Sequence, residues 1–326
     1  MNRILAWLCV WSFVLSAGCD GQADRATFRS LQTTVQREAW TGRYANGVIL
    51  STEHYRIYTT CTDESLVEFL PGFMEAAHTH YRVLTGVEAL SDARIGRMYL
   101  LADRQQWADV TRRVTGSRAP RYLAIQAGGY CHKGTCVLWD LGPAQTAAVA
   151  AHEGLHQFLT FHLRDGLPMW LEEGLCVSVE GFAVDEKKNV TFDPDFAWTL
   201  RRDLRRALER GRWMPLQTLL SMDVASAIRE DNEQAVAYYA QLWALVKFLH
   251  THDAWRDGMK QLIADARDGQ LRSRLDMSWL EFQLLRADGR RYNDTLSEPL
   301  FRAYIADDMA DFEQAFEAYA RELAGE

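Results

Sequence analysis

His152, Glu153 and His156 stand in the run His-Glu-Gly-Leu-His, which is the pattern H-E-x-x-H. Residues four apart on a helix lie on one face, so both imidazoles can hold one Zn²⁺ ion. Glu153 lies beside them, where a carboxylate can take a proton from the attacking water and return it to a leaving amine. The pattern therefore predicts a zinc site that hydrolyses peptide bonds, with Glu153 as general base and then general acid.

A third metal ligand must come from outside this pattern. His162 has the spacing used in some metalloproteases, but the helix continues up to it, and six helical residues rotate a side chain by about 240°, away from the metal. Glu173 is favoured, because Gly166 and Pro168 break the first helix and a second one from Met169 can return antiparallel to it. The alternatives that stay open are Glu172, Asp165 and His162.

Hydrophobic periodicity indicates which elements position these residues. Apolar and polar residues alternate over 55–59, which predicts a strand, the segments 97–101 and 122–126 are interpreted as further strands, and a hairpin turn is expected at 132–135. Helices are predicted over 63–84, 104–114, 143–164, 169–179, 197–210, 233–250 and 311–323. A strand-rich first half followed by a helical second half indicates an α+β fold.

Residues 152–157 and 166–175 together resemble the gluzincin-type peptidase MA superfamily, and most closely the lipoprotein-rich bacterial group called domain of unknown function 1570. That group has H-E-x-x-H followed by P-x-W-L-x-E-G-x-A, and this chain reads Pro-Met-Trp-Leu-Glu-Glu-Gly-Leu from Pro168. Cys176 stands close to the usual small residue, which is a minor departure. The resemblance implies a zincin-like fold with a strand-rich N-terminal half, an active-site helix and a helical C-terminal half. It also implies Zn²⁺ as cofactor, Glu173 as third ligand and a peptide or protein as substrate.

Two further expectations follow from the resemblance. Gly128 and Gly129 lie where such peptidases place an edge strand that aligns the substrate backbone. Tyr239, preferred over Tyr238, corresponds to the tyrosine from which related enzymes donate a phenol to the oxyanion. The competing hypothesis is a catalytically silent zincin-fold lipoprotein that acts as a binding or scaffold protein, but the presence of Glu153 favours the enzyme.

The N-terminus has the features of an export signal. A cationic start is followed by apolar residues 4–15 and then by Ser-Ala-Gly before Cys19, which resembles the lipobox of bacterial lipoproteins. We expect residues 1–18 to be a lipoprotein signal peptide and Cys19 to be lipidated; an ordinary secretory signal is the alternative. The mature protein would then be anchored to a membrane surface facing the periplasm or the exterior, with inner or outer membrane undecided.

Domain boundaries follow from these assignments. Residues 19–45 are expected to be a tether and lead-in, residues 46–275 the zincin-like peptidase domain, and residues 276–326 a helical C-terminal extension packed on it.

Composition narrows the class of partner. The chain has 36 basic and 44 acidic residues, a net charge of −8 and no dense run of Lys or Arg, which argues against a nucleic-acid partner.

Export permits disulfides, and the hairpin turn places Cys131 opposite Cys136, so we expect these two cysteines to form a disulfide. Cys61 and Cys176 are interpreted as small buried residues, with a bridge between them as the alternative.

Overall fold

The computed structural model describes residues 27–28, 33–41, 44, 46–87, 94–222 and 232–325. The predicted signal peptide over residues 1–18, the predicted lipidation site Cys19 and most of the predicted tether over 19–45 lie outside these residues. Among the residues that are described, no helix is both long and apolar enough to cross a membrane.

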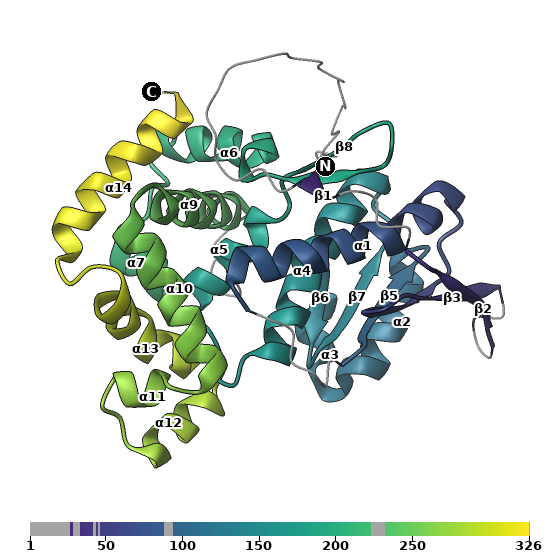
Figure 1. Cartoon of the computed structure of the whole chain (residues 1–326), viewed down its shortest axis with the longest axis horizontal. Helices are drawn as coiled ribbons and strands as arrows, with labels where there is room; N and C mark the ends of the chain where they lie inside the picture. Colours follow the sequence, from purple (N-terminus) through teal and green to yellow (C-terminus); the bar gives the residue numbers. More distant parts are fainter. Residues whose placement is uncertain are drawn as a thin grey trace, which may run out of the picture.

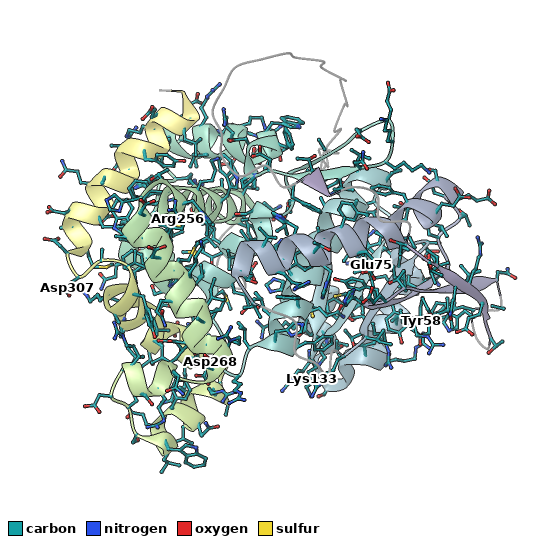
Figure 2. All side chains as sticks on the ribbon, viewed as in Figure 1. Tyr58, Glu75, Lys133, Arg256, Asp268 and Asp307 are labelled. Atoms are coloured by element: carbon teal, nitrogen blue, oxygen red, sulfur yellow. The ribbon has the colours of Figure 1, made fainter. Side chains whose placement is uncertain are left out.

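A six-stranded mixed sheet forms one part of the molecule, at the right in Figure 1. Its strands lie in the order β2-β3-β4-β5-β7-β6, where β4 pairs in parallel with β5 and β5 with β7, and the other pairs are antiparallel. Their bounds are β2 (Gln36–Trp40), β3 (Gly47–Ser51), β4 (Tyr55–Thr59), β5 (Gly96–Leu101), β6 (Gly129–His132) and β7 (Thr135–Trp139). The predicted strands at 55–59 and 97–101 and the predicted hairpin are confirmed. The side chain of Lys133, at the tip of that hairpin, is labelled in Figure 2.

Helices cover both faces of this sheet. On one face lie α1 (Glu64–Thr85) and α4 (Pro143–His162), and on the other lies α2 (Arg104–Thr115). Side chains of β7 alternate between the two faces: Cys136 and Leu138 join the core that contains α1 and α4, whereas Val137 and Trp139 pack with Trp107 of α2. The alternation fixes α4, and with it the H-E-x-x-H residues, on one face of the sheet.

From residue 232 onward the described chain is mainly helical, and it is drawn in green to yellow at the left of Figure 1. Helix α9 (Asn232–Thr251), most of whose side chains are buried, packs against α5 (Met169–Ser178), α6 (Trp198–Glu209), α7 (Leu216–Ser221), α10 (Asp253–Asp268) and α14 (Met309–Ala324). The other helices are α3 (Ala119–Leu123), α11 (Leu271–Arg274), α12 (Trp279–Arg286) and α13 (Gly289–Tyr304), and two 3₁₀ turns span Gly116–Arg118 and Pro194–Phe196. A small second sheet has its strands in the order β1 (Thr27–Phe28), β9 (Val190–Phe192) and β8 (Phe182–Val184). The α+β class and the helices predicted from residue 143 onward are confirmed.

The predicted strand over 122–126 is wrong. Its first residues belong to the short helix α3, which has Pro120 in its first turn, where the fixed φ of proline favours a helix. The residues that follow are held by Arg104, whose Nη2 donates to the carbonyls of Leu123 and Ile125 at 2.9 Å each. This apolar segment therefore forms the end of a short helix and the residues after it, and their carbonyl groups accept hydrogen bonds from a guanidinium group.

The C-terminal helices share the core of the preceding domain. Helix α13 packs against α5, α7 and α10, and α14 packs against α6 and α9. Phe301 and Phe316, both fully buried, belong to the same hydrophobic cluster as the residues under α1 and α4. Residues 276–325 thus form one continuous core with the elements that precede them.

Candidate metal centre

Helix α4 carries the two histidines on one face. It starts where Gly142, with a φ of +88°, turns the chain into Pro143 at the first helical positions. At Gly154, between the histidines, a Cβ atom would lie 2.6 Å from Cε of Met74 and 2.7 Å from the hydroxyl of Tyr81. The same Tyr81 hydroxyl donates to the carbonyl of Ala151 at 2.6 Å. Glycine at this position therefore lets α4 lie close against α1.

Helix α5 brings Glu173 to α4, and it packs closely against α9 at Gly174. A Cβ atom at Gly174 would lie 2.6 Å from Cγ2 of Val246 and 3.1 Å from the backbone oxygen of Leu242. The glycine next to Glu173 thus lets α5 approach α9 closely enough to aim the carboxylate at α4.

Replacing this glycine is expected to destabilise the protein. A Gly174→Ala substitution overpacks the contact between α5 and α9, which costs about 1–3 kcal/mol of the free energy of unfolding; urea unfolding measures it. Gly72→Ala in α1 is the matched control, because no atom lies within 4 Å of the added Cβ. The control should be at least as stable as the wild type, since alanine favours a helix more than glycine does. Equal stability of Gly174→Ala and wild type would contradict the close approach.

The loop between α4 and α5 is held by the C-terminal helices. The Tyr292 hydroxyl donates to the carbonyl of Gly166 at 2.6 Å, and Oδ1 of Asn293 accepts the N–H of Met169, the first residue of α5, at 3.0 Å. Tyr292 and Asn293 also line, together with Glu173, a cavity of about 350 Å³. Helix α13 therefore fixes the start of α5 and borders the space next to Glu173.

His152 and His156 each turn one ring nitrogen toward Glu173. Nε2 of His152 lies 3.5 Å from Oε2 of Glu173, and Nε2 of His156 lies 3.6 Å from Oε1. Two nitrogen or oxygen ligands at about 2.0–2.2 Å from a tetrahedral Zn²⁺ ion lie about 3.3–3.6 Å apart. Glu173 thus lies at ligand spacing from each histidine, whereas the group whose donor atoms all lie within 4.8 Å of one another consists of His152, His156 and Cys176.

The other ring nitrogens are held by two further carboxylates. Nδ1 of His152 lies 2.7 Å from Oε1 of Glu180, and Nδ1 of His156 lies 2.8 Å from Oε1 of Glu172. An imidazole that donates from Nδ1 to a carboxylate presents the lone pair of Nε2, as metal-binding histidines do. Sequence reasoning missed both roles: Glu172 was an alternative ligand, and no spacing rule singles out Glu180, which lies beyond the end of α5.

The charges of the site suit a cation. Burial alone would lower the pKa of both imidazoles, but acidic neighbours raise it well above its usual range: Glu173 and Glu180 for His152, and Cys176 and Glu173 for His156. Burial alone would raise the pKa of the Glu173 carboxyl, but the two imidazoles hold it well below its usual range. Glu173 is thus ionised beside the two imidazoles, and a negative charge at this position suits a cation.

Glu153 lies beside the ligands and is almost fully buried, with 8% of its surface exposed. Burial raises the pKa of its carboxyl, and the neighbouring His152 and His156 oppose this rise. A carboxylate whose pKa is raised takes up a proton more readily than an exposed carboxylate does. The position and the pKa direction of Glu153 are those of a general base.

The other candidate ligands lie elsewhere. His162 packs against Phe158, with ring centroids 4.4 Å apart. Asp165 accepts the N–H of Leu271 and lies 3.5 Å from Nη1 of Arg286. Among the residues that the structure describes, Glu173 is the carboxylate that faces Nε2 of both histidines.

Of the two neighbouring tyrosines, Tyr239 lies next to the site. Its ring centroid is 6.5 Å from that of His152, whereas the hydroxyl of Tyr238 donates to the carbonyl of Met222. Burial and the charge of Glu173 raise the pKa of Tyr239 well above its usual range, so its phenol stays protonated and can donate a hydrogen bond.

The predicted substrate strand lies at an edge of the sheet. Gly129 is the first residue of β6, which pairs only with β7 among the described strands. Gly128 precedes it with a φ of +125°, a conformation that favours glycine. A Cβ atom at Gly129 would lie 3.1 Å from Cγ1 of Val149 in α4, so this edge strand runs close beside the helix that carries the histidines.

Four cysteines are described, and all four are free thiols in this structure. Cys131 and Cys136 are direct cross-strand partners on β6 and β7, and the disulfide between them stays a prediction. Cys61 is only partly buried, so its prediction as a buried residue is wrong, and its Sγ donates to Oδ2 of Asp140 at 3.4 Å. Cys176 is fully buried, as expected, but it lies against the histidine pair, a position that its interpretation as a packing residue missed.

The carboxylates behind the histidines should matter for metal affinity. The Glu180→Gln substitution keeps the size of the side chain but removes the charge at Nδ1 of His152, so zinc affinity should fall about 10–100-fold. Competition with a chelator measures it. Glu186→Gln, at an exposed position of the β8–β9 turn, is the control and should bind zinc like the wild type. An unchanged affinity in Glu180→Gln would show that the carboxylate does not support the ligand.

Comparison with known proteins gives no family for this chain. No protein-family model matches it, and no curated protein matches it significantly. The case for a metal centre therefore stands on the geometry of the chain's own side chains.

Proposed function

We propose that this protein is a zinc-dependent metallopeptidase that hydrolyses peptide bonds in a peptide or protein substrate. His152, His156 and Glu173 would hold the metal. The observation that carries the proposal is the set of carboxylates around the histidines: Glu173 faces both Nε2 atoms, while Glu180 and Glu172 hold the two Nδ1 atoms. Three carboxylates arranged in this way around two imidazoles serve one purpose in a metal site and have no comparable reason to gather in a hydrophobic core.

The chain's own residues have distinct parts in the reaction. A Zn²⁺ ion bound here supplies a Lewis acid that polarises the scissile carbonyl and makes water more acidic. Glu153 takes the proton of the attacking water and passes it to the amine that leaves. Tyr239 donates a hydrogen bond to the carbonyl oxygen as negative charge develops on it. The free edge of β6, at Gly128 and Gly129, aligns the substrate backbone by strand addition.

We also propose that the protein is an exported lipoprotein anchored through Cys19, which keeps this site outside the cytoplasm. The Cys19→Ala variant should lose incorporation of radiolabelled palmitate and appear in the soluble fraction. Cys61→Ser is the control and should keep both the label and the membrane fraction. Unchanged labelling of Cys19→Ala would contradict the anchor.

The function is tested on the purified chain by zinc quantification and cleavage of a peptide library. We expect about one zinc ion per chain, loss of cleavage after treatment with a chelator, and recovery with Zn²⁺ but not with Mg²⁺. Absence of zinc would contradict the ligand assignment. Zinc without cleavage of any library member would favour the competing hypothesis, a silent zincin-fold binding or scaffold protein.

A further inference from the structure

A fully buried thiol stands beside the proposed ligands. Cys176 lies one turn after Glu173 on α5, so both side chains leave the same face of that helix. Its Sγ and one nitrogen from each of His152 and His156 all lie within 4.8 Å of one another. The thiol is therefore aimed at the same space as the imidazoles, which a small packing residue in a core does not require.

The other described cysteines do not share this position. Sγ of Cys136 points at the carbonyl of Glu153, at 3.2 Å, and Cys61 points at Asp140. Cys131 faces Cys136 across the hairpin. Of the four described cysteines, Cys176 is the one that falls into a group able to hold a metal ion.

We propose that Cys176 is a fourth protein ligand of the metal and closes the site in the resting protein. The inference rests on the proposed function, because it takes His152, His156 and Glu173 as the other three ligands. The thiol gives its proton to solvent as the bond between sulfur and metal forms. Two imidazoles, a carboxylate and a thiolate make a donor set that suits Zn²⁺ and disfavours Mg²⁺ and Ca²⁺.

This fourth ligand has a consequence for catalysis. Catalytic zinc sites keep three protein ligands and one open position, whereas sites with four protein ligands are closed. With Cys176 as a ligand, the fourth position would be taken by sulfur, and the site would accept a water molecule only after the thiolate had left it. The resting protein is thus a latent form of the enzyme.

Cobalt(II) reports directly on a thiolate ligand, because sulfur bound to Co²⁺ adds an intense charge-transfer band in the near ultraviolet. The metal-free chain is titrated with Co²⁺ alone, and the wild type should show this band at one equivalent. Cys176→Ser should lose the band, and its zinc affinity should fall by about 10-fold or more. Cys61→Ser and Cys136→Ser are the matched controls and should keep the band.

A wild-type cobalt complex without the thiolate band overturns the proposal, whether or not the variants fold. A band that survives in Cys176→Ser, or that disappears in a control, overturns it as well. Cleavage that depends on zinc and on Glu153, together with no thiolate band, leaves the proposed function intact and removes this inference. The reverse result, a band that depends on Cys176 together with no cleavage by either the wild type or Cys176→Ser, supports the ligand and contradicts the peptidase.

Discussion

The Glu153→Gln variant is expected to lose peptide cleavage by about 10²–10⁴-fold while it keeps one zinc ion per chain. Glutamine has nearly the same size and can still accept a hydrogen bond, but it cannot take a proton from water or deliver one to an amine. Glu153 is buried beside the histidines without being one of the proposed ligands, so the metal should stay bound. The measurements are kcat/KM on a cleaved peptide and the zinc content of the same preparation.

The control for this exchange is Glu68→Gln, which makes the same change at an exposed position of α1. It should leave both the cleavage rate and the zinc content unchanged. Full activity in Glu153→Gln would remove this residue as the proton carrier. Loss of zinc in that variant would contradict the separation between Glu153 and the ligands.

The histidine pair could be predicted from the sequence because its geometry is local. Four residues on any α-helix bring two side chains to one face, whatever the rest of the chain does. Glu173 could be favoured for a similar reason, since the break at Gly166 and Pro168 leaves two helices free to pack against each other. Both predictions needed only helix geometry and one chain reversal.

The support of the site could not be predicted because it depends on long-range packing. Glu180 reaches His152 after α5 has ended, in a turn whose direction no periodicity encodes. The hydrogen bonds of Tyr292 and Asn293 to Gly166 and Met169 join residues more than 120 positions apart in the sequence. Such contacts exist only once α9 and α13 have packed on α5.

Cys176 and the segment 122–126 show two ways in which a pattern misleads. The thiol has the size of a packing residue, and its position three residues after Glu173 gains meaning only when α5 lies against α4. The mostly apolar segment 122–126 reads like a strand. Instead, Pro120 lies in the first turn of a short helix there, and Arg104 donates to two carbonyls at the end of that helix and just after it. Side-chain size and hydrophobic periodicity predict the local structure correctly only where no specific polar contact competes with them.

The Glu173→Gln variant is expected to lose more than 100-fold in zinc affinity, which exceeds the loss expected for a carboxylate that only supports a ligand. The exchange removes the charge of a proposed ligand that faces the two Nε2 atoms, and it leaves the two imidazoles and the proposed Cys176 ligand to hold the ion. Because zinc that binds only the folded chain stabilises it, the rise in Tm on zinc addition should shrink as well. Zinc competition and thermal unfolding with and without zinc measure the two effects.

Glu172→Gln is the matched comparison, since it makes the same exchange at the adjacent residue, whose carboxylate holds Nδ1 of His156. Its affinity loss should stay within about 10–100-fold, so the two neighbours should differ by an order of magnitude, about 1.4 kcal/mol of binding free energy. A larger loss for Glu172→Gln would exchange the roles of ligand and support. Wild-type affinity in both variants would contradict both roles, the ligand role of Glu173 and the supporting role of Glu172.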